Sequence, residues 1–224
     1  MNNSLIVNDI AAGAIGTNGD ININVGSFAA NNSFISTSTQ GEGNSGNISI
    51  KALESILFDS SRIFNTVNDG AKGDSGTIKL DANNIELNNG STISTSVLGT
   101  GKGGEIYLKA SNQISISNSF LTSGLDAVDA KGTAGNIRIE ADSVFFNQTA
   151  ISSGTNGQGN AGNILIIGNN LVSLSDRASL NSNVDFNAKG EGGEINIKSN
   201  SLSLTDNASI NSTTFGQGNS GNIS

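Results

Sequence analysis

A short motif, glycine followed by one variable residue and then isoleucine, recurs along the whole chain and constrains its fold more than any other feature. Its copies begin at Gly19, Gly46, Gly76, Gly104, Gly135, Gly162, Gly193 and Gly221. Successive copies are 27 to 31 residues apart, so the period is about 29 residues. A regular period of this length is typical of repeat proteins in which each unit packs only on its neighbours. The sequence therefore predicts a stack of similar units.

Each unit contains three segments with the pattern of β-strands. The motif opens an alternation of apolar and polar residues, as in Ile48-Ser49-Ile50, which is typical of a half-buried strand. A second apolar pair follows seven to nine residues later, as in Ile85-Glu86-Leu87. A turn-like stretch such as Asn88-Asn89-Gly90-Ser91 or Thr205-Asp206-Asn207-Ala208 then leads to a third strand. That strand is marked by one apolar residue per unit: Ile35, Ile63, Ile93, Leu121, Ile151, Leu180 and Ile210.

We therefore expect an all-β fold, a right-handed parallel β-helix of about seven coils of about 29 residues with three strands per coil. No segment has helical apolar spacing with capping residues, which argues against β-α-β units and leucine-rich horseshoes. The units are also shorter than propeller blades. Residues 1–224 are expected to form a single repetitive domain. Because the chain stops at Gly221-Asn222-Ile223-Ser224, where another coil would begin, we interpret it as a segment of a longer protein.

A finer pattern is that short and long loops alternate. The distance from the third-strand apolar residue to the next motif is 11 residues in one coil and 13 or 14 in the next. Short loops contain Gly-x-Gly at Gly41, Gly99, Gly157 and Gly216, whereas long loops share Ala-Lys-Gly at Ala71, Ala130 and Ala188. The sequence thus predicts a two-coil unit of about 58 residues with one decorated edge.

Composition excludes several classes of function. The net charge of −8 argues against nucleic acid and anionic lipid as partners. The chain has no cysteine and no histidine, so it lacks disulfides, thiolate metal sites and the usual general base near neutral pH. No apolar run is long enough to span a membrane, and no export signal is visible at the start. We expect no catalytic residues, no cofactor-binding residues, no metal ligands and no membrane insertion.

The string Gly41-Glu42-Gly43-Asn44-Ser45-Gly46, repeated at 157–162 and 216–221, matches the glycine pattern of dinucleotide-binding loops. A nucleotide site needs this pattern once, between a strand and a helix. Here the pattern recurs every second coil and opens a strand. We interpret it as a tight corner in which glycine supplies positive φ.

Acidic residues of the longer loops leave two interpretations open, calcium binding or solvated surface charge. They are Asp69, Asp74, Asp126, Asp129, Asp185 and Glu191. Their spacing matches neither an EF-hand nor the nonapeptide calcium repeat, so we favour solvated charges. β-Helical polysaccharide lyases also use acidic metal sites beside a basic residue. Their coils carry long excursions that build a cleft, and no such excursion is visible in this sequence.

Two polar columns follow the third-strand apolar residue. One contains Ser36, Ser94, Thr122, Ser152, Asn181 and Asn211, and the other contains Thr37, Asn65, Thr95, Ser123, Ser153, Ser182 and Ser212. If the apolar residue points inward, the first column faces solvent. A flat row of threonine would favour ice binding, but Phe64 interrupts the column and its residues are mixed, so we favour a polar exterior that resists aggregation.

Two short motifs have simpler explanations than a binding function. Lys72-Gly73-Asp74 resembles an integrin-type tripeptide, although three residues in a glycine-rich loop arise easily by chance. Sequons at Asn89, Asn147 and Asn207 offer glycosylation sites in an exported protein. A repeated turn that prefers asparagine explains them equally well.

The repeated order of Gly-Asn-Ile-x-Ile, then Leu-x-x-x-Ser-x-Ile, then Gly-x-Gly-x-x-Gly resembles the passenger region of filamentous-haemagglutinin-type exoproteins of two-partner secretion, especially long cyanobacterial versions. The resemblance covers nearly the whole chain. It implies a right-handed β-helical filament, exported through an outer-membrane transporter partner, that serves adhesion or surface structure. The secretion domain of that family contains an Asn-Pro-Asn-Leu motif. This chain has no proline, so that domain is absent from it.

We therefore expect a non-catalytic structural and adhesive segment of a secreted or outer-surface bacterial protein, with a surface carbohydrate or a neighbouring cell as partner. The rival hypothesis is a carbohydrate-active β-helix enzyme, of lyase or hydrolase type. Clustered carboxylates beside a basic residue in one groove would favour that enzyme. The third hypothesis is an ice-binding solenoid.

Overall fold

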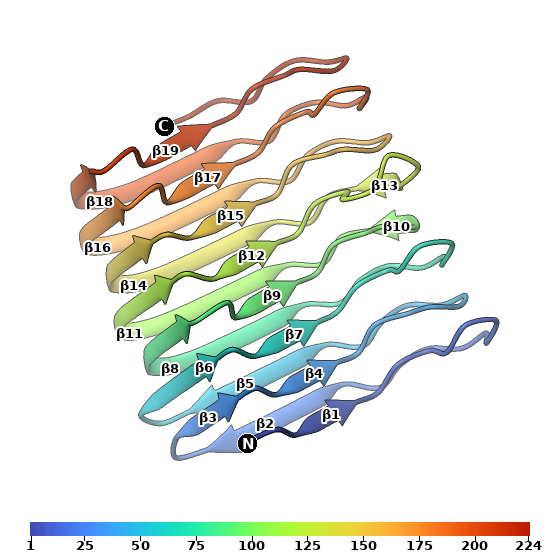
Figure 1. The fold of residues 1–224 in the computed structure, drawn as a ribbon, viewed down its shortest axis with the longest axis horizontal. Helices are drawn as coiled ribbons and strands as arrows, with labels where there is room; N and C mark the ends of the chain where they lie inside the picture. The colour runs from blue at the N-terminus through green and yellow to red at the C-terminus, as the bar shows by residue number, and fades with distance from the viewer.

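The computed structural model describes residues 1–224 as a parallel β-solenoid without any helix (Figure 1). Every strand pairing is parallel, and successive coils lie side by side from the N-terminal to the C-terminal end of the stack. The predicted fold is thus confirmed, with about seven turns spaced about 29 residues apart. No part of the chain forms a long apolar helix of the kind that crosses a membrane.

The first and second strands of each coil build one nine-stranded sheet, which we call the long sheet. In the first two coils these strands are separate, whereas from the third coil onward they run together as one strand of 10 to 12 residues. A register shift, for example between Lys109 and Gln113, marks the place where the two strands join. The members are β2 (Ile21–Val25), β3 (Phe28–Asn31), β5 (Ile48–Ala52), β6 (Ser55–Asp59), β8 (Ile78–Asn88), β11 (Ile106–Ser117), β14 (Ile137–Asn147), β16 (Ile164–Ser175) and β18 (Ile195–Leu204).

The third strands build an eight-stranded sheet, which we call the short sheet. Each strand has three residues, and the middle one is the apolar residue that marked the third strand in the sequence. Ile93, for example, is 1% exposed and faces the interior. The members are β1 (Leu5–Val7), β4 (Phe34–Ser36), β7 (Arg62–Phe64), β9 (Thr92–Ser94), β12 (Phe120–Thr122), β15 (Ala150–Ser152), β17 (Ser179–Asn181) and β19 (Ser209–Asn211).

The two sheets are joined at two edges. At one edge, which we call the corner, a short turn leads from the long sheet into the short sheet. At the other, which we call the loop edge, the glycine-rich loops return to the long sheet. The loop edge holds the two-stranded sheet of β10 (Thr100–Lys102) and β13 (Lys131–Thr133) and a series of single parallel bridges between successive coils.

The predicted alternation of loops has a packing cause at the loop edge. Long loops contain an extra turn, closed for example by the Ala71 amide donating to the Asn68 carbonyl at 3.0 Å. The next coil places Gly99 against that turn, and a side chain there would overlap the carbonyl oxygens of Ala71 and Asn68. The same relation recurs at Gly41, Gly157 and Gly216. Short loops with glycine at this contact therefore alternate with long loops that contain alanine in the turn. This alternation produces the two-coil unit seen in the sequence.

The interior contains two apolar clusters. A cluster of 35 buried residues fills the space between the long and short sheets. A smaller cluster of Val67, Ala71, Val97, Leu125 and Ala130 lies toward the loop edge. Because each coil covers the apolar residues of its neighbours, stability is a sum over adjacent coils.

Between the two clusters runs a buried column of hydroxyl and amide side chains, the polar column. It consists of Thr37, Asn65, Thr95, Ser123, Ser153, Ser182 and Ser212, all buried except Ser212, which is half-buried near the C-terminal end. The motif glycines form a glycine column of Gly46, Gly76, Gly104, Gly135, Gly162, Gly193 and Gly221. The side chains of the polar column donate to the carbonyls of all of these except Gly76 and Gly221. Thr95 and Ser123, for instance, donate to the Gly104 carbonyl at 2.8 and 2.7 Å. The polar column thus joins opposite walls of the flattened coil.

Candidate functional site

The corner is built from turns whose residues adopt positive φ. These residues are Asn3, Asn32, Ser60, Asn89, Asn118, Gln148, Asp176, Arg177, Asp206 and Asn207. Asparagine, aspartate and glycine tolerate this left-handed conformation better than other residues, which confirms the predicted turns at Asn88–Ser91 and Thr205–Ala208. Some coils have one such residue and others have two, so adjacent turns differ in length. Two polar hollows lie along this corner.

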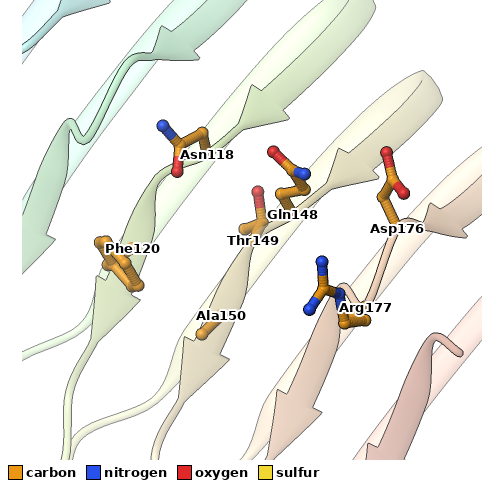
Figure 2. A pocket seen from close by; sticks show the side chains of 7 residues that line it. All are labelled: Asn118, Phe120, Gln148, Thr149, Ala150, Asp176 and Arg177. Atoms are coloured by element: carbon orange, nitrogen blue, oxygen red, sulfur yellow. The ribbon is translucent and has the colours of Figure 1, made fainter.

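The larger hollow, which we call the Phe120 pocket, spans three coils and encloses about 400 Å³. Its walls are the turns before β12, β15 and β17 and the first residues of β12 and β15. Figure 2 shows Phe120 and Ala150 on neighbouring coils, with Arg177 on the coil beyond and the amides of Asn118 and Gln148 nearby. The pocket is open on one side and is lined by Asn118, Phe120, Gln148, Thr149, Ala150, Asp176 and Arg177.

A second hollow, the Phe34 pocket, repeats this composition nearer the N-terminus and encloses about 320 Å³. It is lined by Asn32, Ser33, Phe34, Ser60 and Arg62. Phe34 and Phe120 occupy the same position of the short sheet, because Phe34 pairs in register with Arg62, Arg62 with Thr92, and Thr92 with Phe120. The two pockets are therefore related by three steps of the repeat.

The chemistry of both pockets combines an aromatic ring with polar groups, among them one arginine that forms no ion pair. Phe120 is 45% exposed, because its column points away from the core. Phe34 is partly covered by an edge-to-face contact with Phe64 at 5.6 Å between ring centroids. Arg62 and Arg177 are exposed and belong to neither of the two ion pairs of the chain, Lys72–Glu42 and Arg138–Glu140. Aromatic rings and unpaired guanidinium groups are enriched at binding surfaces.

A different cluster of charged residues lies on the outer face of the long sheet. The Tyr107 hydroxyl donates to Glu140 Oε2 at 2.9 Å, and Arg138 forms an ion pair with Oε1 of the same carboxylate. Lys79 and Arg138 lie 5.6 and 5.5 Å from the Tyr107 ring centroid. Desolvation, and secondarily the hydrogen bond to Glu140, raises the pKa of Tyr107. Both oxygens of Glu140 are thus engaged, and the cluster links three adjacent coils.

The acidic residues of the long loops do not converge. No three or more carboxylates gather in an arrangement that would hold a metal ion. Two of the six have a structural partner in the next coil instead. The Asp74 carboxylate accepts the Lys102 amide at 2.9 Å, and the Glu191 carboxylate accepts the Asn219 amide at 3.0 Å. These two residues replace backbone acceptors between stacked loops.

Two aspartates of the loop edge give the solenoid a predicted pH dependence. Desolvation raises the pKa of Asp126, with a further contribution from the Asp185 carboxylate, and desolvation also raises the pKa of Asp185. Between the ordinary aspartate pKa of the unfolded chain and the raised pKa of the folded chain, the folded state binds more protons, so stability falls as pH rises through that window. We expect the thermal midpoint to rise on acidification from about pH 7 toward the ordinary aspartate pKa, at about pH 4.

The Asp126→Asn/Asp185→Asn double variant should lose part of this rise, as measured by circular dichroism melting at both pH values. Asp129→Asn, in the same loop as Asp126, is the control for removing one negative charge. An unchanged pH response in the double variant would assign the effect to other groups.

The two columns predicted after the third-strand apolar residue differ in their surroundings. The first points outward, as expected, but Ser36 and Ser94 within it are buried by neighbouring side chains. Ser36, for example, donates to the Asp9 carboxylate at 2.6 Å. Only one threonine, Thr122, stands in this column, and Phe64 interrupts it. The second column is the buried polar column described above.

The remaining motifs are engaged in the stack. In Lys72-Gly73-Asp74 the lysine pairs with Glu42 at 3.0 Å and the aspartate accepts the Lys102 amide. The sequon hydroxyls of Ser91 and Thr149 are buried and donate to backbone carbonyls within or beside the turn. The second glycine of the Gly-x-Gly strings has positive φ, for example 138° at Gly43, as predicted.

Comparison with known proteins finds no matching family model, no matching curated protein and no matching solved structure.

The pocket residues Phe34, Arg62, Phe120 and Arg177 were not identified from the sequence. A signal for the phenylalanines was present, because each directly precedes the inward apolar residue of a third strand. Alternation places such a residue on the outside, where an aromatic side chain is unusual. Arg177 carries no comparable signal, because its place depends on the conformation of the turn.

Proposed function

We propose that this chain is a non-catalytic structural and adhesive segment of a secreted or outer-surface protein. The stacked coils hold a long, rigid outer surface on which similar groups recur at fixed intervals. The partner is a carbohydrate or another component of a neighbouring surface. Export through an outer-membrane transporter belongs to the same proposal and rests on the resemblance of the repeat to two-partner-secretion exoproteins.

The observation that carries the adhesive role is the repetition of one pocket composition along one corner. The Phe34 and Phe120 pockets both present an aromatic ring, a left-handed turn with an amide side chain and an unpaired arginine. Repeated shallow sites suit a partner that is itself repetitive, because several weak contacts along one polymer add up to firm attachment.

An adhesion and turnover assay tests the proposal. Beads coated with the purified chain are allowed to settle on surfaces coated with polysaccharides or with bacterial cells, and the beads retained under flow are counted. In parallel, the same polysaccharides are incubated with the chain and analysed for new reducing ends and unsaturated sugars. We expect retention above that of albumin-coated beads, and no products.

Release of products would support the rival enzyme and overturn the non-catalytic role. Retention no better than that of albumin-coated beads on every surface would overturn the adhesive role. For the predicted location, protease treatment of intact source cells should degrade the protein, whereas protection until lysis would contradict an outer-surface position.

A further inference from the structure

We infer that the corner binds a neutral polysaccharide chain laid along the stacking axis, with one sugar ring on Phe120 and another on Phe34. This inference rests on the proposed adhesive function and names the ligand class and the site. It draws on three features of the corner: a phenylalanine ring in each pocket, exposed at Phe120 and half-buried at Phe34, polar groups around each ring, and the alignment of both rings in one column.

Each ring offers a flat apolar surface beside polar groups. Phe120 lies at the start of β12, where its ring is 45% exposed, and the small Ala150 follows it in the next coil. Figure 2 shows that no other labelled side chain covers the ring. The face of a sugar ring presents C–H groups, and an exposed aromatic face packs against such groups with little loss of side-chain entropy.

The polar groups of the Phe120 pocket match hydroxyl groups, which both donate and accept. Arg177 donates only, Asp176 accepts only, and the amides of Asn118 and Gln148 do both. The positive φ values of these residues, 45° at Asn118 and 63° at Arg177, fix the directions in which their side chains leave the turn. The Phe34 pocket offers Arg62 as a donor, together with Asn32 and Ser60, whose side chains also hydrogen-bond to Asn3 and Asp59, and its lining contains no carboxylate.

The charges favour a neutral polymer over an acidic one. The chain carries a net charge of −8, so a polyanion meets overall repulsion. Asp176 lies directly beside Arg177 and offsets its charge within the pocket. A guanidinium group that shares its pocket with an aspartate and two amides suits neighbouring hydroxyls, to which its planar fork donates two parallel hydrogen bonds.

The positions of the rings favour a chain along the axis. Three coils separate Phe34 from Phe120, which at one inter-strand spacing per coil is about 14 Å. Arg62 and Thr92 lie between the two phenylalanines in the same column. An extended oligosaccharide of several rings spans this distance, whereas a disaccharide reaches only one pocket. Once one ring of the oligosaccharide is bound, the second pocket binds another ring of the same molecule, so the overall affinity exceeds that of either pocket alone.

The test is isothermal titration calorimetry with cellohexaose, mannohexaose and cellobiose, and affinity electrophoresis in gels containing hydroxyethylcellulose, mannan or polygalacturonate. We expect binding to at least one of the neutral polysaccharides, with an affinity that is the same at low and high salt. The hexaose of that polysaccharide should bind at least tenfold more tightly than its disaccharide. Phe120→Ala and Phe34→Ala should each weaken hexaose binding at least tenfold, and the double variant should not bind. Arg177→Gln, a milder change at the turn, should weaken it as well.

Phe186→Ala is the matched control, because Phe186 is a 70% exposed phenylalanine of the loop edge, away from the corner. It should bind as the unaltered chain does, and the circular dichroism spectra and urea midpoints of all variants should agree. Tight binding of polygalacturonate that disappears at high salt would overturn the claim that the ligand is a neutral polysaccharide. Neutral binding that persists in both phenylalanine variants would overturn the site. Absence of glycan binding with continued bead retention would overturn this inference and leave the adhesive role standing.

Discussion

Replacing Gly135 by alanine is expected to lower the free energy of unfolding by at least about 3 kcal/mol. Gly135 belongs to the glycine column, and its amide donates to the Ser123 carbonyl at 2.7 Å. A side chain at this position would overlap the Gly104 carbonyl oxygen and the Ser123 hydroxyl. Both belong to the coil before, so relief requires separating two coils in the middle of the stack. Urea unfolding followed by circular dichroism measures the loss.

Gly26→Ala is the control for this variant. Gly26 is exposed, its φ is not positive, and nothing lies within 4 Å of the added carbon. Its urea midpoint should stay close to that of the unaltered chain or rise slightly, since alanine restricts the unfolded chain. Amide hydrogen exchange should be faster in the coils on both sides of residue 135 in the Gly135→Ala variant, and unchanged in the Gly26→Ala variant. A midpoint for Gly135→Ala equal to that of Gly26→Ala would contradict the close contact between coils.

The strand positions were predictable because the side-chain alternation of a strand is local. Ile48, Ile78 and Ile106 are buried in adjacent strands of the long sheet, as the spacing of the glycine motif requires. The apolar residue of each third strand was placed correctly for the same reason. The two-coil unit was also visible, because a difference in loop length appears directly in the numbering.

Features that depend on the cross-section of the coil were not predictable. The first two strands were expected to be separate, yet β8 runs from Ile78 to Asn88 without a break, because the bend is taken up by a shift of register. The pockets of the corner depend on turn conformations, which determine whether Arg177 lies over β15 or points away. The sequence placed Ser153 in a column, but not opposite Gly135, because the path of the chain through β14, the corner turn and β15 determines that approach.

The polar column explains how a flattened coil keeps its two walls at one distance. Apolar contacts alone tolerate small shifts, whereas a hydrogen bond between a side chain and a carbonyl sets both distance and direction. Glycine on the facing wall is part of the same arrangement, because a larger residue would occupy the place of the hydroxyl. The bond recurs along the stack in two forms: Thr37 donates to the motif glycine nine residues ahead, Gly46, and Ser212 donates to the motif glycine 19 residues behind, Gly193, each at 3.0 Å.

Ser153→Ala tests this mechanism and should lower the free energy of unfolding by about 1–3 kcal/mol. The Ser153 hydroxyl is fully buried and donates to the Gly135 carbonyl, which accepts no backbone hydrogen bond. Removing the hydroxyl leaves a buried acceptor without a partner, and this costs more than the loss of a bond exposed to water. Urea unfolding of the variant and of the unaltered chain in parallel gives the difference.

Ser152→Ala is the neighbouring control, because Ser152 points outward and its hydroxyl has no hydrogen-bond partner in the chain, so a change within about 0.5 kcal/mol is expected. Ser153→Thr should retain most of the stability, since threonine occupies the same column at Thr37 and Thr95, where it donates to the carbonyl of the motif glycine nine residues ahead. Equal losses in Ser152→Ala and Ser153→Ala would mean that the hydroxyl column contributes nothing beyond packing. If only Ser153→Ala loses stability and Ser153→Thr recovers it, the hydrogen bond itself sets the distance between the two walls.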